Sequence, residues 1–480
     1  MPCPYKDNGT PPASESPSRS AIARGRMAST TKTLDDTTDD RHPRDRLGRE
    51  LSALDATMLV VSSVIGVGIF LTPGTVAQAL PHPGLILAAW LAGGVLSLAG
   101  ALANAELGAM YPHAGGDYVY LREAYHPVAG FIVGWLSFFV IYAGTIATLA
   151  TGFAEGLERF VSLGAGGRAA VAIALTLFAS AVNYVGVRVG AHFNNFTAAI
   201  KIAALVGLAV VGPLVGSGSL AHLRPLLAGA GAIPMSAYGL ALSPILFSYL
   251  GWNASVYVAS EIRHPARNIP RSLFLGLGIC TAIYLVLNVA YLYALPVDVL
   301  RGQVRVGEAA AGAFFGSAGA TIGAVLVLAS VVSCLNATIL VGPRIAYAMA
   351  LDGLFFGAVD RVHAVYRTPH VAIAVQAITA AGLILLLRSF PSVLDYTTFA
   401  IVLATMADTT ALYALRRRQP KRKRPYRAWG YPLVPALYLV ANAAIAVAML
   451  TGRPLECAVA LGMTATGIPF YLAFRRWRRT

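Results

Sequence analysis

The first long apolar segment of this 480-residue chain contains the stretch SSVIGVGIF, which runs from Ser62 to Phe70. Two glycines, Gly66 and Gly68, are separated by one residue near the middle of that segment. Glycine lets the backbone leave helical geometry and lets other groups approach it closely. At membrane depth, irregular backbone is tolerated only where it faces protein or a watery cavity. The stretch therefore predicts a membrane helix that is broken at a functional site.

The sixth apolar segment carries a corresponding stretch, ILFSYLGWN, from Ile245 to Asn253, with Gly251 in its middle. Paired interruptions in corresponding segments indicate an inverted-repeat transporter with its site at the midplane. Either stretch alone fits a close-packing face of small residues equally well, but the correspondence favours two breaks. Helix N-termini at a break suit a carboxylate, and exposed carbonyls suit an ammonium group. The pair of stretches thus predicts a site for a zwitterion.

Composition places the chain in a membrane. Hydrophobic residues make up 56% and charged residues 12%, and the mean hydropathy is +0.64, whereas soluble domains carry about 25% charged residues. The net charge of +15 alone would fit a nucleic-acid or a membrane partner. The four cysteines have no metal-type spacing, so neither a disulfide framework nor a zinc site is indicated, and we expect no cofactor.

Twelve segments are long and apolar enough to cross a bilayer, which takes about 20 residues. They are 55–79, 85–110, 127–156, 168–186, 193–215, 236–260, 271–295, 318–349, 370–388, 393–415, 431–451 and 454–474. Of the 37 Lys and Arg residues, 29 fall on the side of the N-terminus and 7 on the opposite side. This bias predicts an inner-membrane protein with both termini in the cytoplasm.

The predicted organisation has five parts. Residues 1–50 form a polar, disordered cytoplasmic tail, and residues 51–415 form a transport core of ten spans. A basic cytoplasmic loop follows at 416–430, then two further spans within 431–474 and a short tail at 475–480. We expect the basic run 416–427 to lie against anionic lipid rather than nucleic acid.

Several motifs resemble those of amino-acid permeases in the amino acid–polyamine–organocation superfamily, and more narrowly the L-type amino acid transporters and their bacterial relatives. They are VIGVGIF (64–70), AELGAMYP (105–112) with GGDYVYL (115–121), FSYLGWN (247–253) with NIPR (268–271), GPRIAYAMA (342–350), and RPYR (424–427) with GYP (430–432). The resemblance implies an all-α membrane protein with twelve transmembrane helices. Two inverted five-helix repeats, with spans one and six broken, would be followed by two C-terminal helices. It also implies alternating-access transport of amino acids.

Carried over by position, the resemblance implies substrate contacts from both broken spans. The residues concerned are Ile65, Gly66, Val67, Gly68, Phe247, Ser248 and Gly251, with Phe247 also the gate. Val67 stands where the family often has serine, and Leu250 where many L-type members have glycine. Leu250 would narrow the pocket, which favours small or medium neutral amino acids. In the resembled family, animal members pair with a heavy chain through an extracellular cysteine between spans three and four. Residues 157–168 contain no cysteine, so no disulfide-linked heavy chain is expected.

Lys201 lies inside the fifth span. A charged group at that depth is costly and is by default a functional hypothesis. Snorkelling of the side chain to the surface is the alternative. In the resembled family a lysine here stands where sodium-dependent relatives bind sodium. The resemblance therefore implies sodium-independent transport, with the ammonium contacting the first span and a role in coupling.

Glu106 and Glu261, near the predicted cytoplasmic ends of spans two and six, are candidates for a proton path or an inner gate. The alternative is a structural ion pair with a loop arginine such as Arg263 or Arg344. Asp55, at the start of span one, is expected to be a helix N-cap. Asp408, in span ten, has no partner that the sequence identifies.

Other functional classes fit poorly. The chain has no H-E-x-x-H, G-x-S-x-G or phosphate-binding G-x-x-x-x-G-K motif, so we do not expect an enzyme. A channel would show pore loops or rings of like charge, and a receptor usually has seven spans. The main alternative is a transporter of cationic amino acids or polyamines. Such a carrier needs an acidic residue facing the pocket, and neither broken stretch supplies one. Proton symport and exchange both remain open.

Overall fold

The computed structural model of the chain describes residues 45–226, 234–387 and 390–477, so the first 44 residues of the predicted tail (1–50) lie outside the described residues. Every regular element within those ranges is helical. The α-helices are α1 (Ala53–Val64), α2 (Gly68–Ala79), α3 (Pro83–Met110), α4 (Asp117–Ala124), α5 (Pro127–Trp135), α6 (Ala143–Leu157), α7 (Gly164–Tyr184), α8 (Val187–Val215), α9 (Met235–Tyr249), α10 (Ala254–Tyr257), α11 (Pro265–Ala294), α12 (Val297–Leu300), α13 (Val306–Val341), α14 (Pro343–Leu351), α15 (His370–Leu387), α16 (Phe390–Arg418), α17 (Leu433–Gly452) and α18 (Pro454–Trp477). A π-helical stretch, Leu136–Tyr142, joins α5 to α6, and short 3-10 turns occur at Leu220–Leu223, Ala259–Glu261 and Gly357–Asp360.

The helices fit a multi-pass membrane protein. Within the described residues, nine helices are long and apolar enough to cross a bilayer, and α1 with α2 forms one further span that is bent by 45°. Two shorter apolar helices cover Ala237–Tyr249 and His370–Leu386. These helices overlap the segments expected from the sequence. The count of twelve spans and the inverted repeats remain predictions.

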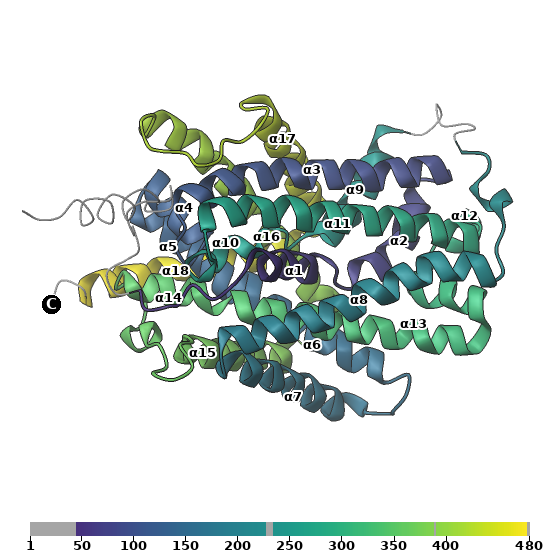
Figure 1. Cartoon of the computed structure of the whole chain (residues 1–480), viewed down its shortest axis with the longest axis horizontal. Helices are drawn as coiled ribbons and strands as arrows, with labels where there is room; N and C mark the ends of the chain where they lie inside the picture. The colour runs from purple at the N-terminus through teal and green to yellow at the C-terminus, as the bar shows by residue number, and fades with distance from the viewer. Residues whose placement is uncertain (1–44, 227–233, 388–389, 478–480) are drawn as a thin grey trace, which may run out of the picture. The chain divides into compact units, whose positions relative to one another are not determined.

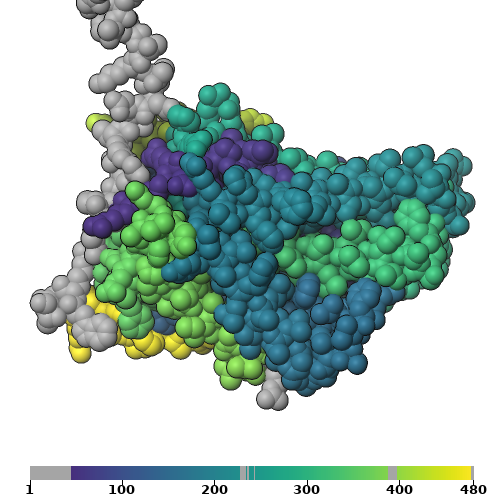
Figure 2. Space-filling model, turned by 60° about the horizontal axis from the view of Figure 1, so that its bottom comes forward, coloured from purple at the N-terminus to yellow at the C-terminus, as the bar shows by residue number. Residues whose placement is uncertain are grey.

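The broken first span lies among longer helices. α3 runs beside α11 (Figure 1), and α8 runs beside α13 (Figures 1 and 2). α1 packs against α8, α11 and α13, and α2 packs against α9. Large apolar side chains are exposed on the outer helices α7, α8, α17 and α18, as suits helices that face lipid. The two short halves of span one are thereby enclosed by protein, where irregular backbone is tolerated.

The first helix begins with a capping box. Ser52 is the N-cap, and its Oγ accepts a hydrogen bond from the backbone N–H of Asp55 at 3.2 Å. In return, the Asp55 carboxylate accepts one from the backbone N–H of Ser52 at 2.7 Å. The expectation that Asp55 is the N-cap is therefore wrong. The Ser-x-x-Asp spacing makes serine the cap and the acid its partner in the first turn.

The last part of the predicted tail packs onto the helices in the described structure. Leu47 is buried in a cluster with Ala114, Tyr347 and Leu351. Leu51 donates its backbone N–H to the carbonyl of Glu261 at 2.8 Å. The chain is thus fixed to the end of span six before α1 begins.

Candidate functional site

The first break leaves backbone carbonyls that other helices satisfy. Between α1 and α2, residues 65–67 depart from the helix. Lys201 Nζ, from α8, donates to the carbonyl oxygens of Ile65 at 2.6 Å and Ser62 at 3.2 Å. The hydroxyl of Ser330, from α13, also donates to the Ile65 oxygen, at 3.1 Å. The break is thereby held open by side chains from two neighbouring helices.

The second break lies between α9 and α10. Gly251 has a φ of +95°, a conformation that L side chains rarely adopt and glycine adopts readily. A Cβ atom at this position would also lie 2.8 Å from the carbonyl oxygen of Ser63. Gly251 therefore permits both the left-handed turn and the close approach of this break to the first span.

The two broken spans are in direct contact. A Cβ atom on Gly68 would lie 2.5 Å from Ser248 Oγ, and Thr72 Oγ1 lies 2.9 Å from the same oxygen. The hydroxyl of Tyr284, from α11, lies within hydrogen-bonding distance of the Val64 carbonyl at 2.9 Å and of the Ser248 carbonyl at 2.8 Å. One phenol thus bridges the ends of α1 and α9.

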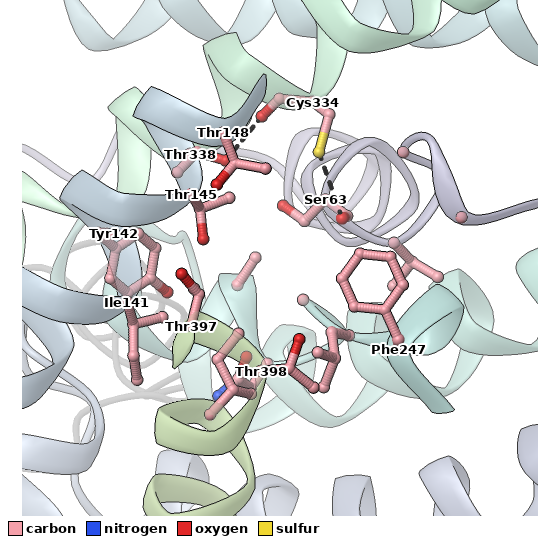
Figure 3. A pocket seen from close by; sticks show the side chains of 18 of the residues that line it. Ser63, Ile141, Tyr142, Thr145, Thr148, Phe247, Cys334, Thr338, Thr397 and Thr398 are labelled. Atoms are coloured by element: carbon pink, nitrogen blue, oxygen red, sulfur yellow. Dashed lines mark hydrogen bonds between the residues drawn. The ribbon is translucent and has the colours of Figure 1, made fainter. Parts of the chain in front are cut away.

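A pocket opens where the breaks meet (Figure 3). Most of the site residues expected from the resemblance line it, namely Gly66, Val67, Gly68, Phe247, Ser248, Leu250 and Gly251. Ile65 does not line this pocket, because its carbonyl oxygen faces Lys201 and Ser330 instead. The breaks therefore present backbone groups and the side chains of Val67, Phe247, Ser248 and Leu250 to one pocket.

The opposite wall of the pocket is rich in hydroxyl groups, which the sequence analysis missed. In Figure 3 the hydroxyls of Tyr142, Thr145 and Thr397 gather on one side, and Phe247 lies across from them. Further threonines from α6, α13 and α16 also line it, namely Thr148, Thr338, Thr398 and Thr405. Threonine recurs within these otherwise apolar spans, and that recurrence could have indicated the polar wall. The sequence does not show which helix faces meet, so it could not place these threonines in one pocket.

Lys201 is 3% exposed and its ammonium points at α1 rather than at a membrane surface. This geometry removes the snorkelling alternative. Within the described residues, no carboxylate forms a salt bridge with it, and its hydrogen-bond partners are carbonyl oxygens. Its role in coupling remains a prediction.

Glu261 lies outside the pocket lining and is held in an ion pair. Its carboxylate accepts two hydrogen bonds from the guanidinium of Arg344, at 2.7 and 3.2 Å, and both side chains are buried. This is the structural pair named as the alternative to a coupling role. Because the charge is neutralised in a bidentate pair, nothing in this geometry calls for a proton on Glu261.

Glu106 is also neutralised, but by the basic loop. It accepts hydrogen bonds from Arg416 at 2.5 and 3.0 Å, from Arg424 at 3.1 Å, and from the backbone N–H of Ala428 at 2.7 Å. The guanidinium of Arg422 lies over the ring of Tyr111, 4.0 Å from its centroid. Part of the positive charge expected at the lipid surface is therefore bound to the end of α3.

One acidic side chain does line the pocket. Asp117, the first residue of α4, is fully buried, and its Oδ2 accepts a hydrogen bond from the hydroxyl of Tyr257 at 2.5 Å. The sequence argument against a cationic substrate rested on the lack of an acidic residue in the two broken stretches. Asp117 lies in neither stretch. Asp117 lies in the GGDYVYL motif, which the sequence shows. The sequence does not show that its side chain faces the pocket.

Comparison with known proteins agrees with this architecture. The family model described as amino acid permease matches residues 51–471. The serine/threonine exchanger SteT of Bacillus subtilis is 31% identical over 91% of this chain and 99% of its own length. The Asc-type amino acid transporter 1 of Mus musculus is 28% identical over 91% of this chain and 83% of its own length. The human b(0,+)-type amino acid transporter 1 is 28% identical over 90% of this chain and 89% of its own length.

The family model extends from just ahead of α1 into α18, and the relatives match over about nine tenths of the chain. These matches, the apolar helices and the two broken spans lead to one assignment. The chain belongs to the amino acid permease family of the amino acid–polyamine–organocation superfamily, and it is a multi-pass membrane transporter of amino acids rather than an enzyme.

Proposed function

We propose that the chain carries small or medium neutral amino acids across the plasma membrane without sodium, by alternating access, with both termini in the cytoplasm. The observation that carries this proposal is the meeting of the two breaks at one pocket, with Lys201 bound to the first break. In this proposal, the start of α2 binds the substrate carboxylate, the carbonyls near the second break bind its amino group, and Phe247 closes the pocket.

The proposed independence from sodium rests on the carbonyl oxygens that Lys201 binds at the first break. Oxygen ligands such as backbone carbonyls are the groups that hard cations prefer. Here the carbonyls of Ser62 and Ile65 already receive an ammonium group, 3.2 and 2.6 Å away. A fixed positive charge at that place supplies what a bound cation would otherwise provide.

The walls of the pocket support a small, preferably polar, side chain. Leu250 reduces the space near the second break, and threonine hydroxyls line the opposite wall. Such hydroxyls can pair with a substrate hydroxyl, which an apolar pocket would leave unpaired. The name of SteT, a serine/threonine exchanger, points in the same direction. Serine, threonine and alanine are therefore the first substrates to test.

A cationic substrate is the second candidate, because Asp117 lines the same pocket. An arginine or polyamine that extended toward α4 would meet a carboxylate there. The test is competition: unlabelled arginine and putrescine should compete poorly with serine if the neutral assignment holds. Strong competition by arginine that Asp117→Asn removes would instead support the cationic assignment.

The proposed function is tested by counterflow in liposomes without sodium. Purified protein is reconstituted with a mixture of unlabelled amino acids inside, and uptake of labelled alanine, serine, leucine, phenylalanine and arginine is followed. We expect uptake of alanine and serine, less of leucine, and little of phenylalanine. Uptake that requires sodium, or uptake of arginine alone, would overturn the proposal.

A further inference from the structure

We propose that Asp117 and Asp408 form a proton-binding site at the end of the pocket next to α4. Asp408, in α16, lies within hydrogen-bonding reach of Asp117. Both side chains are fully buried. Two carboxyl groups can share a hydrogen bond only when one of them carries a proton, because ionised carboxylates are acceptors alone.

The surroundings supply no counter-charge. Within the described residues, neither Asp117 nor Asp408 forms a salt bridge with a basic side chain, in contrast to Glu106 and Glu261. The titratable groups that face the pair are the phenols Tyr120 of α4, Tyr142 of the π-helical stretch, Tyr257 of α10 and Tyr438 of α17. Placing two negative charges side by side in such a site is strongly unfavourable, as it is in other buried carboxyl pairs.

Unpartnered polar groups beside the pair point to a bound proton independently. The side chain of Asn104, from α3, is fully buried and lies next to Asp408, but among the described residues no partner meets its amide nitrogen or its oxygen in hydrogen-bond geometry. Among the same residues, both Asp408 oxygens and Asp117 Oδ1 also lack a donor in that geometry. A single proton shared by the two carboxyls would satisfy part of this need, whereas two charged carboxylates would leave it unmet.

A chain of hydrogen bonds links the pair to the second break. Asn253, just after that break, donates its side-chain N–H to the hydroxyl of Tyr257 at 3.1 Å, and Tyr257 donates to Asp117 Oδ2 at 2.5 Å. The carbonyl of Tyr257 also accepts from the backbone N–H of Gly115 at 3.1 Å, just ahead of α4. A movement of α10 when substrate binds would therefore act directly on Asp117.

This link gives the proton a role in the transport cycle, and that role rests on the proposed function. While the pocket is closed, the pair holds its proton. When the pocket opens to water on the side of α4, water can solvate both carboxylates and the proton can leave. Uptake of substrate would then be coupled to an inward movement of protons, with Lys201 holding the first break throughout.

The first test detects the protonated carboxyl group directly and does not depend on transport activity. Infrared spectra of the reconstituted protein at pH 7 should show the carbonyl band of a protonated carboxyl group that shifts in deuterium oxide. Asp408→Asn should lose this band, and Asp117→Asn gives a second route if that variant folds poorly. Asp298→Asn, at a side chain that is 86% exposed, is the matched control and should keep the band. An unchanged band in both folded pair variants, or no band in the parent, would overturn the site.

The second test separates coupling from transport. With one proton per substrate, a gradient of one pH unit supports about tenfold accumulation. We expect an acidic exterior to drive uptake of serine by the parent protein and by Asp298→Asn, and no such drive in Asp408→Asn. If the parent exchanges serine at equal pH but ignores the gradient, the coupling role is wrong. If the parent shows no counterflow at all, the proposed function fails, and the infrared result alone decides the proton site.

Discussion

Lys201 and Glu261 are both buried charges, but their partners differ. In the described structure, Lys201 Nζ donates to the backbone carbonyls of Ser62 and Ile65, whereas the Glu261 carboxylate is held by the guanidinium of Arg344. A buried charge without a counter-charge is expensive in a membrane. Such a charge is expected where function requires it, and a neutralised pair is expected where the structure does. From this comparison we expect Lys201 to act in transport and Glu261 to stabilise the fold.

Replacing Lys201 with alanine should have the largest effect on transport. We expect Lys201→Ala to abolish serine counterflow because the carbonyls at the first break lose their donor, while the protein remains folded. Counterflow is measured alongside elution as a monodisperse protein and thermal unfolding. Full counterflow by this variant would show that transport does not require Lys201, and the proposed difference in role between Lys201 and Glu261 would then be wrong.

Neutralising Glu261 should instead destabilise the fold. Glu261→Gln leaves the guanidinium of Arg344 buried without its partner, which costs about 3–5 kcal/mol. We expect a clear drop in the thermal midpoint of the purified protein. The double variant Glu261→Gln/Arg344→Met should recover much of it, because it removes both charges. If Glu261→Gln has the same thermal midpoint as its parent but does not transport, Glu261 acts in transport rather than in stability.

A methyl group at the contact between the breaks should impair transport more than stability. Gly68→Ala would place a Cβ atom 2.5 Å from Ser248 Oγ and 2.8 Å from its Cα. Overpacking of this kind costs about 1–3 kcal/mol, equivalent to roughly a fivefold to 150-fold loss of uptake if the closed state of the pocket is the one destabilised. Gly207→Ala, which meets nothing within 4 Å, is the matched control. Equal uptake by both variants would show that the contact is not part of the cycle.

The smallest effect is expected on substrate preference. Leu250→Gly should enlarge the pocket and raise uptake of leucine and phenylalanine relative to alanine by about tenfold, the range expected for a change of this size in an apolar pocket. The ratio of counterflow rates measures it, with each rate corrected for folded protein. An unchanged ratio would mean that Leu250 does not set the size limit.

Much of the helical architecture was predictable because hydrophobicity is a local property. The apolar segments at 127–156, 431–451 and 454–474 correspond closely to helices in the structure. Helix ends were less predictable: α8 begins at Val187, ahead of the apolar segment expected from 193. In α13 the backbone leaves helical geometry at Gly316, with a φ of +67°, so the part of this helix after the break begins close to the expected start at 318. Helical geometry continues beyond the hydrophobic part of a span, so hydropathy alone does not locate its ends.

The candidate site was predictable only where the backbone itself carries it. Gly66, Gly68 and Gly251 mark the breaks through a property of glycine that sequence shows directly. Asp117 and Asp408 could not be paired in this way, because they lie on different helices and only packing brings them together. The same applies to the arginines of the basic loop that bind Glu106.

The central claim is that the pocket between the two breaks binds the transported amino acid without sodium. Cys334 lines that pocket, with its Sγ 3.6 Å from the carbonyl oxygen of Ser63. A variant with Cys3, Cys280 and Cys457 replaced by alanine leaves Cys334 as the single thiol. Its rate of alkylation is measured in sodium-free buffer with and without saturating serine. The account predicts that serine slows alkylation of Cys334, and an unchanged rate in a variant that still transports serine would contradict it.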